Sequence, residues 1–327
     1  MSANGPIIVT GPDRSGTTLL YALLGSHPDI SMVRRTNMWR WFDQRFGDLA
    51  VPANLDRCLD AMLRYKRLQV LEPDADRLRA AFARGPQTYG HLFDLFHRQH
   101  ADRQGRRRWG DKSLHTEFHA DRVFAELPTA RMIHVVRDPR DRYASIIRRY
   151  EGRTKGVGAA MGRWIASQRQ GRRNLARHPA RYMVVGYETL ARAPESTLRR
   201  ICDFLDEEYD PVMLRMGAVA GDADQHGNSS FGSFEPGAIS TRPIGRYREI
   251  LTPRQIAFIQ ACAGREMRAH DYAPMPVRLS TRDRTAFYTA DLPAGWARLA
   301  GWTVAQRINE WRDGGAPEQR LTSPAPA

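Results

Sequence analysis

The sequence predicts an α/β fold, a parallel β-sheet flanked by helices, with a phosphate loop of the P-loop kind after its first strand. Three short apolar runs carry this prediction, at residues 6–10, 131–136 and 182–185. Each run is followed by a turn signal and then by a helical pattern. Strands that alternate with helices favour a parallel sheet covered on both faces.

The first strand–loop–helix unit is the clearest. Residues 6–10 are apolar and partly β-branched, as in a buried parallel strand. A glycine-containing turn begins at Gly11, and residues 17–24 have the composition of a helix. His27 and Pro28 end that helix, because the residue before a proline disfavours helical geometry.

The two later units repeat this order. The strand at 131–136 is closed by Asp138 and Pro139, and a helix is expected to continue to about Tyr150. The strand at 182–185 leads into a helical apolar pattern at 198–205.

Between and after these units lie less regular segments. Residues 32–104 are helical, rich in Arg and aromatics, and are predicted to form a substrate-side insertion. Residues 217–240 are rich in Gly, Ser and Asp and predict a mobile loop. Thr252 and Pro253 have the pattern of a helix start, with Thr as N-cap.

The composition changes beyond about residue 276. An amphipathic stripe from Trp296 to Trp311 predicts a helix that packs on the domain, forms a homodimer contact or touches a membrane surface. The Pro- and Ala-rich residues 314–327 predict disorder. We therefore expect one domain over 1–275 and a C-terminal extension over 276–327.

Composition excludes several classes of protein. The 327 residues are 42% hydrophobic, which excludes global disorder. Only three cysteines occur, far apart, so a disulfide scaffold and a cysteine-rich zinc site are excluded. No apolar run spans a bilayer and no secretory signal is evident, so a cytoplasmic location is expected. The net charge of +14 favours anionic ligands.

A phosphate loop is predicted between the first strand and its helix. The first turn of a helix leaves N–H groups unpaired and favours anions. The loop has the spacing of a Walker A motif, but Thr17 replaces the Walker lysine. A sulfuryl group carries less charge than a phosphoryl group, so Arg, hydroxyl and backbone donors can hold it without metal. The loop residues expected to bind are Arg14, Ser15, Gly16, Thr17 and Thr18.

A second anion site is predicted after the strand at 131–136. Arg137 lies at the carboxyl end of that strand, where ligands of parallel sheets bind. Ser145 follows eight residues later, in the next helix, and can reach the same space. A guanidinium and a hydroxyl together suit a phosphate monoester.

These two motifs resemble those of the sulfotransferases, which use 3′-phosphoadenosine-5′-phosphosulfate (PAPS). The loop from Arg14 is similar to their 5′-phosphosulfate loop, closest to the bacterial and Golgi-type branches, which carry Arg there. The resemblance implies that Arg137 and Ser145 bind the 3′-phosphate of PAPS. It further implies that Tyr187 approaches the adenine and that Arg242 belongs to a loop closing over the cofactor. The product is then 3′,5′-ADP, and no metal is required.

Sulfuryl transfer to a hydroxyl needs a base and donors for the leaving phosphate. His115 lies 22 residues before Arg137, the separation of the catalytic histidine in the cytosolic branch. Lys112 falls close to the family lysine that touches the transferring group, and Asp111 is the alternative base. Glu117 is a further carboxylate in this segment, while the glutamate base of the tyrosylprotein branch is replaced here by Arg34 and Arg35.

The leading hypothesis is therefore a PAPS-dependent sulfotransferase acting on a hydroxyl or amine of a small molecule, glycan or lipid. A P-loop kinase shares the architecture, but the missing lysine disfavours it. A basic protein that binds nucleic acid or a membrane surface fits the charge alone, and no nucleic-acid recognition motif accompanies it.

Overall fold

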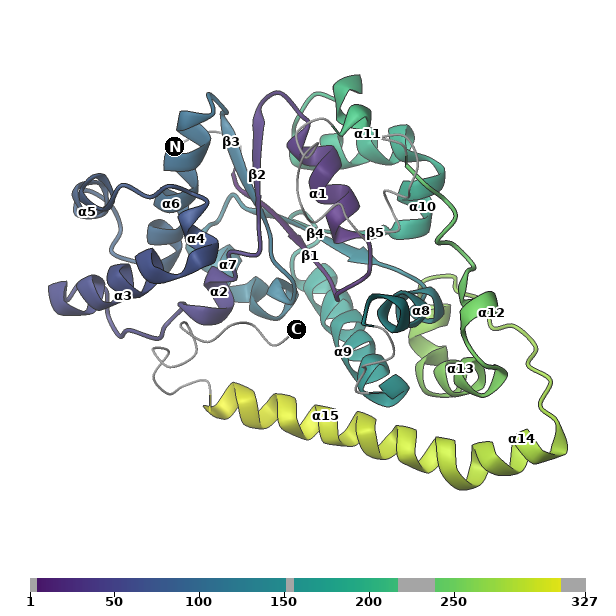
Figure 1. Cartoon of the computed structure of the whole chain (residues 1–327). Helices are drawn as coiled ribbons and strands as arrows, with labels where there is room; N and C mark the ends of the chain where they lie inside the picture. Colours follow the sequence, from purple (N-terminus) through teal and green to yellow (C-terminus); the bar gives the residue numbers. More distant parts are fainter. Residues whose placement is uncertain (1–4, 151–155, 217–238, 313–327) are drawn as a thin grey trace.

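A computed structural model of the chain describes residues 5–150, 156–216 and 239–312, with side chains to residue 305. Its centre is a five-stranded, fully parallel sheet in the order β2-β3-β1-β4-β5 (Figure 1). The strands are β1 (Ile7–Thr10), β2 (Ile30–Arg34), β3 (Arg108–Lys112), β4 (Arg131–Val136) and β5 (Tyr182–Gly186). The expected parallel α/β fold is confirmed.

Helices cover both faces of this sheet (Figure 1). Those before β4 are α1 (Thr17–Gly25), α2 (Met38–Trp41), α3 (Pro52–Arg64), α4 (Lys66–Gln69), α5 (Ala75–Phe82), α6 (Tyr89–Arg103), the 3₁₀ turn η1 (Thr116–His119) and α7 (Ala120–Glu126). Those after β4 are α8 (Pro139–Arg149), α9 (Gly156–Arg177), α10 (Tyr187–Arg192), α11 (Pro194–Leu205), η2 (Pro211–Arg215), α12 (Tyr247–Ile250), α13 (Pro253–Arg268), α14 (Thr281–Ala286), the π-helical turn η6 (Phe287–Asp291) and α15 (Leu292–Arg312).

Strand β1 shows how the sheet separates two apolar cores. Successive side chains of a strand point to opposite faces. Ile8 joins the core built with the helical insertion α2–α6, whereas Ile7 and Val9 join the core under α1 and α11. The carboxyl end of β1 is thereby fixed on both faces, and it is the end from which the phosphate loop emerges.

Strands β2 and β3 were not predicted from the sequence. Strand β3 is buried along its whole length although it contains Arg108, Asp111 and Lys112. Arg108 is satisfied by groups on other elements: it pairs with Glu207 at 3.0 Å and donates to the backbone carbonyl oxygens of Gly5 and Leu205. A strand of this composition has no apolar run, so periodicity does not reveal it.

The C-terminal helix α15 packs against the first turns of α9 (Figure 1). The backbones meet closely at Gly158, where an added Cβ would lie 2.0 Å from the carbonyl oxygen of Gly295. Trp302 covers Gly162, while Trp296 remains 45% exposed. The helix expected at Thr252 is confirmed, with a full capping box. The loop and tail predictions at 217–240 and 314–327 fall almost wholly outside the described residues.

Candidate active site

The phosphate loop turns sharply between β1 and α1. Gly11, Arg14 and Gly16 have positive φ angles of 137°, 63° and 94°. Gly16 is the N-cap of α1, and an added Cβ there would lie 2.3 Å from the ring of Tyr187. Glycine is thus required at this position by both backbone geometry and space. Because the loop joins the carboxyl end of β1 to the start of α1, the unpaired N–H groups of the first turn of α1 lie at the carboxyl end of the sheet.

The two predicted anion motifs meet in space. The Nε of Arg14 donates to the Oγ of Ser145 at 3.0 Å, across 131 residues of sequence. The Nη1 of Arg137 donates to the carbonyl oxygen of Arg14 at 3.2 Å. Burial and the nearby charge of Arg137 lower the pKa of Arg14. Two cations this close are stabilised by a bound anion.

Arg137 is only 4% exposed and lies directly after β4. Its Nη2 donates to the carbonyl oxygen of Pro243 at 2.8 Å, and its guanidinium stacks on the Tyr187 ring at 4.4 Å. Its buried Nε and the buried Oγ of Ser15 have no hydrogen-bond partner among the described residues. Buried donors without acceptors are rare, so this site fits an oxyanion.

Tyr187 is buried inside the anion site, whereas Arg242 is exposed at the surface. The Tyr187 ring is wholly buried between Gly16 and the guanidinium of Arg137, so it supports both phosphate motifs. Arg242 is exposed, immediately before the Pro243 carbonyl that accepts from Arg137. The segment carrying Arg242 is therefore tied to the second anion site through the backbone.

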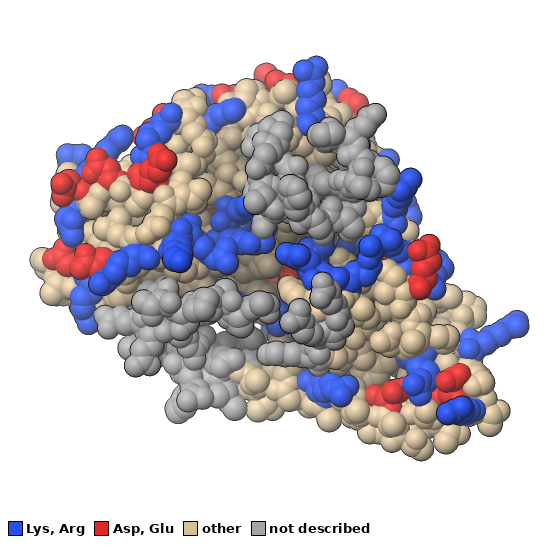
Figure 2. Space-filling view, in the orientation of Figure 1, with Lys and Arg blue, Asp and Glu red and all other residues tan. Residues whose placement is uncertain are grey.

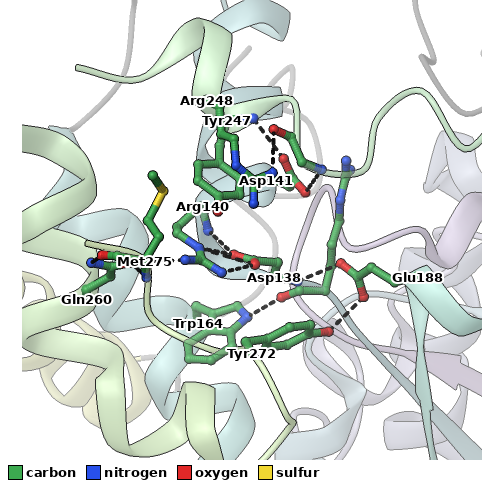
Figure 3. Close-up of polar contacts among 12 residues, drawn as sticks. Asp138, Arg140, Asp141, Trp164, Glu188, Tyr247, Arg248, Gln260, Tyr272 and Met275 are labelled. Carbon is green, nitrogen blue, oxygen red and sulfur yellow. Dashed lines mark hydrogen bonds and ion pairs between the residues drawn. The ribbon is translucent and has the colours of Figure 1, made fainter. Parts of the chain in front are cut away.

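The acidic residues that follow Arg137 hold this region together (Figure 3). Asp138 caps α8 and pairs with the guanidinium of Arg140 at 2.6 Å. The backbone N–H of Asp138 donates to Glu188 at 2.9 Å, and Glu188 also accepts from the hydroxyl of Tyr272 at 2.8 Å. These contacts fix the end of β4 against α10 and the segment after α13.

Asp141 anchors the segment that leads from Arg242 into α12. The sequence did not indicate this role. Its carboxylate accepts from the backbone N–H groups of Gly245 at 2.6 Å and Tyr247 at 2.9 Å (Figure 3). Burial raises the pKa of Asp141, and the two N–H groups oppose this. The only sequence signal is a second aspartate three residues after Asp138, which local pattern does not connect to residue 245.

Lys112 reaches the phosphate loop from β3. The side chain is 3% exposed, and its Nζ lies 3.5 Å from Oγ1 of Thr18, in the first turn of α1. Thr17, beside it, is 4% exposed. A cation therefore approaches the loop from a neighbouring strand, although the loop itself lacks the Walker lysine.

Asp111 points away from Lys112, because neighbouring strand residues face opposite sides of the sheet. Its Oδ2 accepts from Thr36 at 2.6 Å and from Ser113 at 2.8 Å, and the residue is 3% exposed. Burial raises the pKa of this carboxyl. This environment suits a structural carboxyl on the side of the helical insertion.

His115 follows β3 and caps η1 with a positive φ of 69°. Burial lowers the pKa of its imidazole, and the carboxylate of Glu117 opposes that shift. Arg163 and Arg40 lower the pKa further, while Asp13 of the phosphate loop raises it. His115 is thus half-buried beside the loop and is neutral at physiological pH, as a general base must be.

No group of three or more metal-ligating side chains occurs within the described ranges. Across the same residues, no helix combines the length and apolarity needed to cross a bilayer. On the face drawn in Figure 2, Lys and Arg side chains form a band across the middle of the molecule.

A phosphate loop and two converging arginines at the carboxyl end of a parallel sheet define a protein with a site for a phosphate-like anion. Comparison with protein families makes this specific. Residues 6–211 match the model of the sulfotransferase family. The chain belongs to this family, and its reaction class is sulfuryl transfer.

Solved structures agree on the fold. The sulfotransferase domain of the Synechococcus PCC 7002 olefin synthase matches with 22% identity and a TM-score of 0.56, covering 84% of this chain and 98% of that one. The sulfotransferase domain of the curacin biosynthetic pathway matches with 18% identity and a TM-score of 0.60, covering 84% and 100%. A comparison with curated proteins finds no match.

Proposed function

We propose that this sulfotransferase uses PAPS as donor and transfers the sulfuryl group to a hydroxyl or amine of its acceptor. One observation carries the proposal: Arg14, Ser145 and Arg137 converge where Arg137 Nε and Ser15 Oγ are buried without partners in the described chain. A nucleotide with phosphates at both the 5′ and 3′ positions needs two such adjacent anion sites.

In this proposal PAPS supplies the activated sulfuryl group. Arg137 and Ser145 bind the 3′-phosphate, and the loop residues Ser15 to Thr18 bind the 5′ side with backbone and hydroxyl donors. Arg14 and Lys112 stabilise the charge that develops on the leaving phosphate. His115 removes the acceptor proton.

A P-loop kinase is the enzymatic alternative, and ligand choice distinguishes the two. We expect 3′,5′-ADP to stabilise the protein against thermal unfolding, by about 2.7 kcal/mol at a hundredfold excess over Kd, with no requirement for Mg²⁺. ATP with Mg²⁺ is expected to give a much smaller shift. Stabilisation by ATP–Mg²⁺ but not by 3′,5′-ADP would exclude the PAPS assignment.

The acceptor side lies where the helical insertion meets His115. Arg40 stacks on the ring of Trp41 at 4.6 Å, and burial together with Arg40 lowers the pKa of His119 to about 4. Basic and aromatic groups here suit a small molecule, glycan or lipid with an anionic or aromatic part. Dimerisation, membrane-surface contact through α15 and a cytoplasmic location stay predictions.

A further inference from the structure

A buried carboxylate lies two residues after His115 and is not accounted for by the phosphate sites. Glu117 has no exposed surface. Its Oε2 accepts from the hydroxyl of Thr10 at 2.5 Å, and its Oε1 accepts from the hydroxyl of Ser167 at 2.6 Å. Among the described residues no Arg or Lys forms an ion pair with it. Burying a carboxylate this way is costly, which points to a function for its charge.

The hydrogen bonds around Glu117 have a single consistent direction. Ser167 has one hydroxyl proton and gives it to Glu117, so it must accept from His134 Nε2 at 3.1 Å. In a neutral His134 ring with its proton on Nε2, Nδ1 is the acceptor for the hydroxyl of Tyr182, at 2.9 Å. Burial lowers the pKa of His134, in agreement with a neutral ring. Every proton in the chain points toward Glu117, as an ionised carboxylate requires.

The same contacts tie the His115 turn to the sheet. Thr10 is the last residue of β1, directly before the phosphate loop, and its Oγ1 also accepts from the backbone N–H of Glu117 at 3.2 Å. Asn174 of α9 donates to the carbonyl oxygen of Glu117 at 2.7 Å. Glu117 is therefore held from β1 and from α9, while His115 beside it keeps a left-handed backbone, which costs energy.

We propose that Glu117 is a positioning residue for sulfuryl transfer: it fixes the turn that presents His115, and its buried negative charge stabilises the imidazolium formed when His115 takes the acceptor proton. The inference rests on the proposed role of His115 as the base. The proton passes from the acceptor hydroxyl to the imidazole as the oxygen–sulfur bond forms and the bond from sulfur to the 5′-phosphate breaks. Glu117 stays ionised throughout.

Four charged groups, on four different elements, influence the pKa of His115. Arg163 from α9 and Arg40 from α2 oppose its protonation, and Asp13 from the phosphate loop and Glu117 from η1 favour it. Asp13 is already paired with Arg142 and lies 3.6 Å from Arg163. Burial raises the pKa of Glu117, and the hydroxyl groups of Ser167 and Thr10, which donate to its carboxylate, lower it. Glu117 is thus the carboxylate left to compensate the charge on His115.

The test is histidine NMR on the full chain with 3′,5′-ADP bound, between pH 3 and 7. The His115 signal is assigned by its loss in His115→Asn. In Glu117→Gln we expect the midpoint of His115 titration to fall by about one pH unit, since one neighbouring charge is removed. Tyr182→Phe, at the far end of the hydrogen-bond chain, is the matched control and leaves the midpoint in place. An unchanged midpoint in Glu117→Gln would overturn the proposal.

A second measurement needs no variant. The side-chain ¹³Cδ signal of Glu117 in the wild-type protein is expected at its ionised position down to pH 5, and a protonated carboxyl at pH 7 would contradict the proposal. Neither readout depends on turnover. If the wild-type protein fails to bind 3′,5′-ADP or to transfer sulfuryl groups, the proposed function fails, whereas the link between Glu117 and His115 is still measured on the unliganded chain.

Discussion

Replacing Arg137 tests the assignment of the second anion site. Arg137→Ala removes a guanidinium that is 4% exposed, together with its hydrogen bonds to the carbonyl oxygens of Arg14 and Pro243. Its partner-free Nε adds a donor for the 3′-phosphate. Hydrogen bonds to a charged group contribute about 1.5–3 kcal/mol. Affinity for 3′,5′-ADP should therefore fall about 10- to 150-fold.

Isothermal titration calorimetry with two nucleotides separates this effect from general loosening of the site. Because 5′-AMP has no 3′-phosphate, its affinity reports only the loss of the hydrogen bonds from Arg137 to the Arg14 and Pro243 carbonyl oxygens and should change little. Ser145→Ala removes a second contact to the same phosphate and should weaken 3′,5′-ADP by about tenfold, the lower end of that range, again with little change for 5′-AMP. Equal losses for both nucleotides in Arg137→Ala would refute the assignment.

Three further outcomes are expected. His115→Ala should lower kcat by about 10²–10⁴ with 3′,5′-ADP affinity retained, and unchanged turnover would exclude it as the base. Burial raises the pKa of Asp13, but Arg142 lowers it to about 2, so about 2 kcal/mol of stability is present above pH 4 and lost as the pH falls toward 2. In urea unfolding experiments, the free energy of unfolding of Asp13→Asn should not show this loss between pH 4 and pH 2. Gly158→Ala should cost about 1–3 kcal/mol in thermal unfolding, because its Cβ meets the α15 backbone. The control Gly301→Ala, with open space around its Cβ, should raise the free energy of unfolding by about 0.5–1 kcal/mol. Equal changes in thermal stability for the two variants would refute the close packing of α15 at Gly158.

Local signals in the sequence were enough to predict the elements that carry the phosphate sites. Strands β1 and β4 are apolar runs that end at a glycine loop and at Asp138–Pro139, so both strand–helix junctions could be predicted. That Arg14 and Ser145 touch could not be, since this contact depends on β1 and β4 being neighbours in the sheet.

The rest required the tertiary structure. Strand β3 is polar in sequence but buried, because its charged groups find partners on other elements. Glu117 was only one of several carboxylates near His115, and its contacts to Thr10 and Ser167 join residues 107 and 50 positions apart. Asp111 and Lys112 are adjacent in sequence, yet they face opposite sides of the sheet.

The most direct test of the central claim is transfer of label from ³⁵S-PAPS. The purified chain is incubated, without added metal, with ³⁵S-PAPS and fractionated small-molecule, glycan and lipid extracts of its source organism. We expect a labelled product that forms together with 3′,5′-ADP and is reduced at least a hundredfold with His115→Ala. If 3′,5′-ADP binds but no fraction accepts label, or if His115→Ala labels the same product at the wild-type rate, the proposed mechanism is contradicted.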